Sequence, residues 1–136
     1  MSYIADLHIH SHFSRATSGD CALPGLHAWA QRKGVAVVGT GDFTHPGWLG
    51  ELREQLEPSA PGLYRLKAGL AREADEGVPP ARRAAVDFML TAEISSIYKR
   101  GGQLRKVHSV LAAPDLATAE AISARLGALG NVKSDG

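Results

Sequence analysis

The stretch VAVVGTG, residues 35–41, indicates what kind of fold this sequence adopts. It is a continuous apolar run closed by glycines, which is typical of a short strand buried on both faces. Similar apolar runs are VDFMLTA, residues 86–92, and KVHSVLAAP, residues 106–114. Buried strands of this kind are characteristic of an α/β fold with a largely parallel sheet.

Helical patterns alternate with these strands. In residues 23–34, LPGLHAWAQRKG, a proline suits the first turn and Gly34 is a stop signal. In residues 115–130, Asp115 is a candidate cap before a regular apolar stripe. A shorter helix is predicted for residues 48–56, and both Trp29 and Trp48 are expected to pack into the core.

The remaining segments connect these elements. Residues 2–9, SYIADLHI, are predicted to form the first strand. Residues 57–85 contain several prolines in a polar stretch, which predicts a surface insertion with at most short helices. Residues 93–105 are predicted to form a loop or hairpin that turns at Gly101 and Gly102.

Length and composition limit the possible classes of protein. A chain of 136 residues with 44% hydrophobic residues suits a single domain with a real core. The net charge of +1 gives no sign of a polyanion-binding tail. The single cysteine, Cys21, excludes an internal disulfide and fits a reducing compartment. No apolar run suggests a membrane span or a signal peptide, so cytoplasmic residence is expected.

Metal-binding side chains cluster at the ends of the predicted strands. In α/β folds ligands gather at the carboxyl ends of the strands, and alternation along a first strand would put His8 and His10 on one face. Four imidazoles and two carboxylates without a thiolate suit zinc, manganese or iron, and a Cys-rich structural zinc site is disfavoured. The candidate ligands are His8, His10, Asp42, His45, Glu93 and His108.

Each candidate has a simpler structural alternative. The pair His8 and His10 could be accidental surface histidines, and His108 could be a satisfied core histidine. Asp42 could stabilise a turn or cap a helix, and His45 could be a plain loop residue. Asp6 is expected to orient a histidine rather than to bind the ion, and His12 belongs to the site only if the first strand continues.

These residues resemble the PHP (polymerase and histidinol phosphatase) family of metal-dependent phosphoesterases. The family's Asp-x-His-x-His motif is matched by Asp6, His8 and His10, whereas its Thr-Asp-His motif is replaced here by TGDFTH, residues 40–45. This change leaves open which of Asp42 and His45 is a ligand. The segments VGTGDFTHPGW, LTAEISSIYK and RKVHSVLAAPD resemble those of the endonuclease Q-like, helicase-associated branch of the family.

The resemblance implies a distorted seven-stranded (β/α) barrel with up to three divalent metal ions, zinc above all, with manganese or magnesium as alternatives. His8 and His10 would hold one ion, Glu93 would bridge it to a second, and His108 would bind that second ion. Asp42 or His45 would serve the third. Endonuclease Q-like enzymes cut DNA on the 5′ side of deaminated bases such as uracil and hypoxanthine, and at abasic sites.

Seven strand–helix units require roughly 200 residues, since one βαβ unit takes about 30. The later histidine and the second Asp-x-His pair of the family have no counterpart here. We therefore expect residues 1–136 to form the N-terminal part of an incomplete PHP barrel. Its exposed strand edge would need self-association or a C-terminal region for completion.

A group of cations suggests a nucleic-acid contact. Arg15 could contact a phosphate in the catalytic site, and four cations follow Glu93 in one loop, which suits a DNA backbone unless they only form a solvated hairpin tip. The resemblance implies damaged DNA as the partner, with a DNA clamp or repair protein as a further one. The alternatives are a small-molecule phosphatase and a non-catalytic metal-stabilised module. The four cations are Lys99, Arg100, Arg105 and Lys106.

Overall fold

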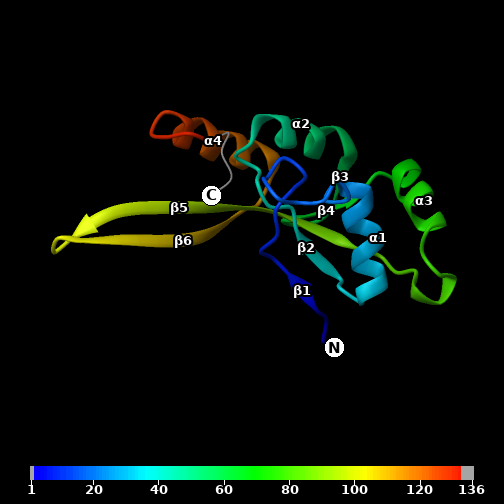
Figure 1. The fold of residues 1–136 in the computed structure, drawn as a ribbon. Helices are drawn as coiled ribbons and strands as arrows, with labels where there is room; N and C mark the ends of the chain where they lie inside the picture. The colour runs from blue at the N-terminus through cyan, green and yellow to red at the C-terminus, as the bar shows by residue number, and fades with distance from the viewer. Residues whose placement is uncertain (1, 133–136) are drawn as a thin grey trace.

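The computed structural model describes residues 2–132 and contains strands and helices in mixed order (Figure 1). The strands are β1 (Ala5–Asp6), β2 (Val37–Gly39), β3 (Leu56–Ala60), β4 (Leu63–Leu66), β5 (Asp87–Arg100) and β6 (Gln103–Ala113). The helices are α1 (Leu23–Lys33), α2 (Pro46–Gln55), α3 (Ala68–Glu76) and α4 (Leu116–Gly127), with a short 3₁₀ turn η1 (Pro80–Arg82).

The six strands form one mixed sheet rather than the largely parallel sheet expected. The order is β1-β2-β5-β4-β3, with β6 paired to β5 outside this path. Only β1, β2 and β5 run parallel, whereas β3, β4 and β6 join by antiparallel pairing. Two-residue turns explain the antiparallel β3–β4 and β5–β6 pairs, whereas β4 and β5 are joined through α3 and η1.

The hydrophobic core lies between this sheet and the helices. Phe88 and Leu90 of β5 are fully buried, as is Trp48 of α2. The prediction of a core position is therefore confirmed for Trp48 and wrong for Trp29, whose side chain is 46% exposed. The Trp29 ring lies beside the cationic groups of Arg32 and Lys33, so it covers the outer surface of α1.

Residues 57–85 do not form a simple surface insertion. They carry most of the β3–β4 hairpin, together with α3 and η1. Tyr64 of β4 pairs with Phe88 of β5, and the side chains of Tyr64, Leu66 and Val78 are buried. The prolines misled the prediction, since Pro58 sits in the outermost strand β3, where a missing N–H donor is tolerated.

The first strand is shorter than predicted. Ladder pairing covers only Ala5 and Asp6, yet the chain continues close beside β2. A Cβ atom on Gly39 would lie 2.5 Å from the Leu7 carbonyl oxygen, and one on Gly41 would lie 2.2 Å from the Ile9 carbonyl oxygen. The Gly41 N–H donates to Thr91 Oγ1 rather than to the Ile9 carbonyl oxygen. Residues 7–9 therefore lie against β2 without the hydrogen bonds of a strand pair.

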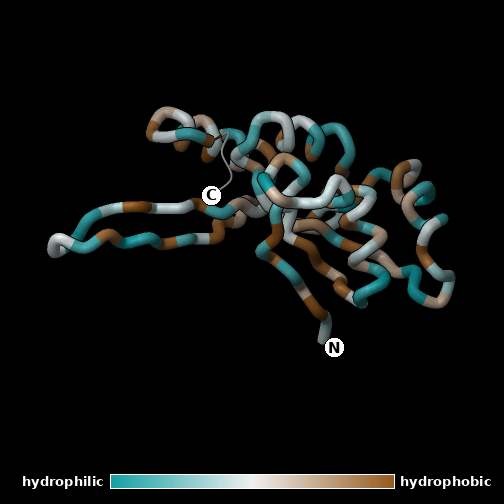
Figure 2. The backbone as a smooth tube through the Cα atoms, in the orientation of Figure 1, coloured by the Kyte–Doolittle hydropathy of each residue, from teal (hydrophilic) through white to brown (hydrophobic). Residues whose placement is uncertain are grey.

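Strands β5 and β6 form a long hairpin that projects from the body of the molecule (Figure 1). Its turn lies at Gly101 and Gly102, as predicted, and both have positive φ angles that glycine adopts without strain. The inner half of β5 is buried, but most of β6 is exposed, so the prediction of a buried strand at residues 106–114 is wrong. Apolar and polar residues are interspersed along the projecting part (Figure 2).

The helix ends agree closely with the sequence signals. Helix α1 ends at Gly34, which has a φ of 74°. Helix α4 begins after Asp115, whose carboxylate accepts the N–H of Thr118 at 2.7 Å. Among residues 2–132, no helix has the length and apolar character needed to cross a bilayer.

Candidate metal centre

Two histidines from the segment after β1 converge on one carboxylate of β5. The Nε2 atoms of His8 and His10 each lie 3.0 Å from Oε2 of Glu93. The two imidazole rings have centroids 5.7 Å apart and are inclined by 60°. Within residues 2–132, this is the one group of three metal-binding side chains whose ligand atoms all lie within 4.8 Å of one another.

His108 joins the same carboxylate from β6. Its Nδ1 contacts Oε1 of Glu93, and its Nε2 lies 3.5 Å from the Ser95 hydroxyl. The antiparallel register pairs Ser95 with His108 and Glu93 with Val110. Glu93 and His108 therefore lie on the same face of the hairpin at neighbouring positions, and β6 brings a fourth residue to the group.

Glu93 is the central residue of this arrangement. Its side chain is only 8% exposed, whereas the His8 and His108 side chains are about half exposed. Hydrogen bonding by His8 lowers the pKa of Glu93; burial opposes this shift, and His108 adds to it. The net effect is a pKa below the ordinary value, so the carboxylate is ionised and available as a ligand at neutral pH.

Asp42 lies behind His10 rather than beside Glu93. Its Oδ1 is 3.1 Å from Nδ1 of His10. Its Oδ2 accepts hydrogen bonds from the Ser11 N–H, the Ser11 hydroxyl and the Ser14 hydroxyl at 2.7–3.0 Å. Both oxygens thus have partners, and the carboxylate fixes the His10 ring so that its Nε2 faces Glu93, a common arrangement around metal-binding histidines.

The sequence analysis missed Ser11 and Ser14, which hold Asp42 in place. Ser11 is completely buried, and Asp42 itself has a φ of 49°, a backbone conformation that non-glycine residues seldom adopt. The sequence offered one indication of this role, since both serines lie within four residues after His10. Asp6, expected to orient a histidine ring, instead accepts the backbone N–H of His8 at 3.4 Å.

His45 and His12 have other partners. The Nδ1 atom of His45 accepts the N–H of Gly47 at 3.2 Å and caps α2, and the His45 ring stacks on Phe13 with centroids 4.4 Å apart. His12 points its Nε2 at the carboxylate of Glu51, 3.0 Å away. The structure therefore brings His8, His10, Glu93 and His108 together, places Asp42 next to them, and gives His45 a capping role.

The donor atoms around Glu93 fit a divalent metal ion. Two ligands of a tetrahedral zinc ion lie about 3.3 Å apart, given bonds of about 2.0–2.1 Å. The contacts of 3.0 Å between each histidine and Glu93 are close to this separation. Nitrogen and carboxylate donors without sulfur suit zinc or manganese, so small side-chain shifts would produce an ion site here.

The predicted cations lie on exposed surfaces. Arg15 is exposed in the loop that follows Ser14, whose hydroxyl binds Asp42. All four cations of the predicted nucleic-acid contact lie in the projecting β5–β6 hairpin, beyond Glu93 and His108: Lys99, Arg100, Arg105 and Lys106.

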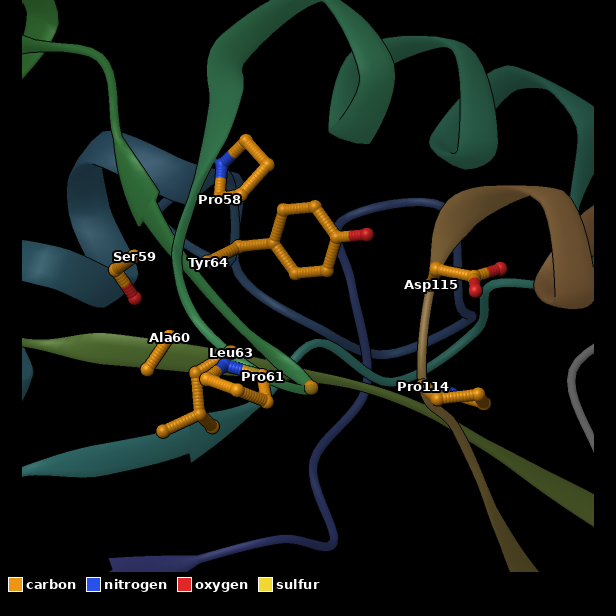
Figure 3. A pocket seen from close by; sticks show the side chains of 9 residues that line it. Pro58, Ser59, Ala60, Pro61, Leu63, Tyr64, Pro114 and Asp115 are labelled. Atoms are coloured by element: carbon orange, nitrogen blue, oxygen red, sulfur yellow. The ribbon is translucent and has the colours of Figure 1, made fainter.

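Two cavities differ in chemical character. One of about 430 Å³ is lined by Tyr64 and several prolines (Figure 3). Its acidic residue, Asp115, is engaged in capping α4 and has a lowered pKa because it accepts the Thr118 N–H, so this cavity has no free reactive group. Another of about 360 Å³ lies between β5 and the end of α4, and Glu93 is part of its lining.

Comparison with known proteins places this geometry in context. No family model matches the chain. A segment of 49 residues is 45% identical to an uncharacterized protein of Methanocaldococcus jannaschii, and this segment covers 36% of the chain and 6% of that protein.

Two solved structures are similar over almost the whole chain. One is Endonuclease Q bound to a 27-mer duplex with an abasic lesion at its active site, with a TM-score of 0.67 and 28% identity over 97% of this chain. The other is the lesion-specific endonuclease PfuEndoQ from Pyrococcus furiosus, with the same TM-score and identity over 96%. The chain spans 28% and 27% of their lengths, so it has the fold of one part of these enzymes.

Proposed function

We propose that this chain forms the metal-binding part of a DNA endonuclease that cuts on the 5′ side of deaminated bases, such as uracil or hypoxanthine, or at abasic sites. The observation that carries the proposal is the convergence of His8, His10 and His108 on Glu93. The likeness to the Endonuclease Q structures supports the choice of DNA as substrate.

In this proposal His8, His10 and Glu93 would hold one divalent ion, and Glu93 and His108 would hold a second. Zinc is the preferred metal, with manganese or magnesium as alternatives. Asp42 orients His10 from behind, since both of its oxygens already have partners. A third ion, expected from the family resemblance on Asp42 or His45, would require one of these side chains to leave its present contacts.

Bound divalent ions supply Lewis-acid chemistry that activates water and offsets charge on phosphoryl oxygens. The residues of the chain do the rest of the work. Glu93 is nearly buried and ionised, so it would offer both carboxylate oxygens as ligands in a fixed position. Arg15 lies on the exposed loop that follows Ser14, and in this proposal it would contact a phosphate of the substrate.

The first experiment measures metal binding by the chain. Zinc and manganese are titrated against a competing indicator, and the amount bound is checked by elemental analysis. We expect Glu93→Gln and His8→Ala to weaken zinc binding at least tenfold. His12→Gln is the matched control, because His12 contacts Glu51 outside the group. Equal zinc binding by all four proteins would refute the proposed site.

The second experiment tests the reaction itself. End-labelled duplexes that carry one uracil, one hypoxanthine or one abasic site are incubated with metal-loaded protein, and an undamaged duplex is the control. We expect a nick on the 5′ side of the lesion that is lost in Glu93→Gln. Release of inorganic phosphate from monoesters without any nicking would instead indicate a small-molecule phosphatase. Metal binding without either reaction would indicate a non-catalytic module.

A further inference from the structure

The β5–β6 hairpin has two chemically different faces. Side chains alternate along each strand, and directly paired residues of an antiparallel ladder share a face. We call the face that carries Glu93 and His108 the site face. Moving outward from the metal group, its next two pairs are Ile97 with Lys106 and Lys99 with Leu104.

The opposite face carries the other two cations. There Ser96 pairs with Val107, Tyr98 with Arg105, and Arg100 with Gln103. The strand register therefore places the four cations, which are close in the sequence, on two opposite faces of the hairpin. Two lysines lie on the same face as the metal group, and two arginines lie on the face that points away from it.

We propose that the site face is the track along which the backbone of one DNA strand reaches the metal group, with Lys106 and then Lys99 contacting successive stretches of phosphate. This inference rests on the proposed function and deepens it, because it names the residues that guide the substrate. Arg100 and Arg105 serve a different surface.

Spacing and exposure support this assignment. Lys106 is two residues from His108, about 7 Å along the strand, and Lys99 is six residues from Glu93, about 20 Å. Both lysines are exposed, and the hairpin that carries them projects from the body of the molecule (Figure 1). Two-stranded ribbons twist strongly, so Lys99 is rotated further from the metal group than Lys106 and contributes less.

The apolar residues of the site face also fit a nucleic acid. Ile97 and Leu104 are 60% and 57% exposed, and they alternate with the two lysines across the ladder. Cationic groups bind phosphates, while exposed apolar side chains cover sugars and the faces of bases. Apolar side chains do not bind a simple inorganic anion, so Ile97 and Leu104 favour a ligand with apolar parts as well as phosphates.

The test compares single alanine substitutions at the four cations in the full chain. Binding of a fluorescein-labelled duplex and of a labelled single strand is measured by anisotropy with zinc present, over a series of salt concentrations. Circular dichroism checks that each variant is folded. Arg72→Ala is the matched control, because Arg72 is exposed on α3 in another part of the molecule.

One phosphate contact adds about 0.7–0.9 to the slope of log K against log salt, so losing it weakens binding about five- to eightfold near 0.1 M salt. We expect this effect for Lys106→Ala and a smaller one for Lys99→Ala. Arg100→Ala and Arg105→Ala should change binding less than twofold, and Arg72→Ala should have no effect.

Equal losses at all four hairpin positions, or larger losses at the arginines, would overturn this inference while leaving DNA binding in place. Absence of DNA binding by the unsubstituted protein at low salt would refute the proposed function, and this inference with it. The two failures are thus distinguishable. The expected ranking, with Lys106 first, supports the site face as the DNA track.

Discussion

Substitution of Gly41 by alanine tests whether the metal group depends on the close approach between residues 7–10 and β2. A Cβ atom on Gly41 would lie 2.2 Å from the Ile9 carbonyl oxygen, whereas real Cβ contacts essentially never fall below 3.0 Å. The carbonyl would therefore have to move by at least 0.8 Å, the difference between these two distances. Ile9 lies between His8 and His10, so both ligands would move with it.

Two costs add at this position. Gly41 has a φ of 62°, and a left-handed conformation costs a residue with a side chain about 1–2 kcal/mol. The displacement affects metal binding separately, because ligand distances are held to about 0.2 Å in working sites. We expect Gly41→Ala to lower the free energy of unfolding by at least 1–2 kcal/mol and to weaken zinc binding about 10- to 100-fold.

The measurements are thermal unfolding of the metal-free chain and competitive zinc titration. Gly39→Ala separates the two costs, because its Cβ would meet the Leu7 carbonyl oxygen at 2.5 Å without a positive φ. Gly50→Ala is the control: no atom lies within 4 Å of its Cβ, and alanine inside α2 should stabilise the chain by about 0.5–1 kcal/mol. A folded Gly41→Ala protein that binds zinc as tightly as the unsubstituted chain would refute the reasoning.

Three further predictions concern the metal, the core and pH. Zinc at 100 times its dissociation constant should stabilise the chain by about 2.7 kcal/mol. At the same zinc concentration this increment in thermal unfolding should fall to about 1.4 kcal/mol or less in Glu93→Gln, since zinc binding is expected to weaken at least tenfold. Trp48→Phe should cost about 1–3 kcal/mol in chemical unfolding, because the buried indole N–H bonds two backbone carbonyls. Burial raises the pKa of Asp75, but hydrogen bonds from Gln31 and His27 outweigh it and leave the pKa below the ordinary 3.8. The ionised Asp75 therefore adds to the free energy of unfolding above pH 3.8, and this stabilisation is lost as the pH falls through the lower folded pKa. The free energy of unfolding of Asp75→Asn should consequently depend less on pH in the acid range.

Local signals predicted the elements whose ends depend on single residues. The turn at Gly101 and Gly102 and the cap at Asp115 needed no knowledge of distant parts of the chain. Strand pairing needed that knowledge. Leu56 begins and Leu66 ends the β3–β4 hairpin, and the two residues pair with each other. Both are buried because this hairpin joins the sheet next to β5, which is distant in the sequence.

The exposed half of β6 shows a second limit. Val107 and Val110 suggested a buried strand, yet both are 45% exposed because β6 pairs with β5 where the hairpin leaves the body. Apolar content predicted the strand itself, while burial depended on which partner covers it. The two valines are three residues apart and lie on opposite faces of the hairpin, so neither face forms a continuous apolar surface.

Spacing alone could not separate the histidines near the N-terminus. His8, His10 and His12 are each two residues apart, but the chain turns after buried Ser11, so His12 meets Glu51 instead of Glu93. The sequence analysis expected His8, His10, His108 and Glu93 to meet at the ends of parallel strands. They do lie together, but Glu93 is inside β5 and His108 is inside the antiparallel strand β6, so hairpin pairing brings His108 to Glu93. The support of His10 by Asp42 depends on the loop around Ser11, which no periodic pattern describes.

The geometry at Glu93 favours ion binding over a purely structural role. The Nε2 atoms of His8 and His10 approach the same oxygen, and His108 contacts the other. A structural carboxylate with 8% exposure needs one or two donors, and half-exposed imidazoles add little stability in water. Three imidazoles around one carboxylate bring together the nitrogen and oxygen donors that a divalent ion binds. The hairpin then continues this group outward with two lysines on the same face, which is where an anionic substrate would first be met.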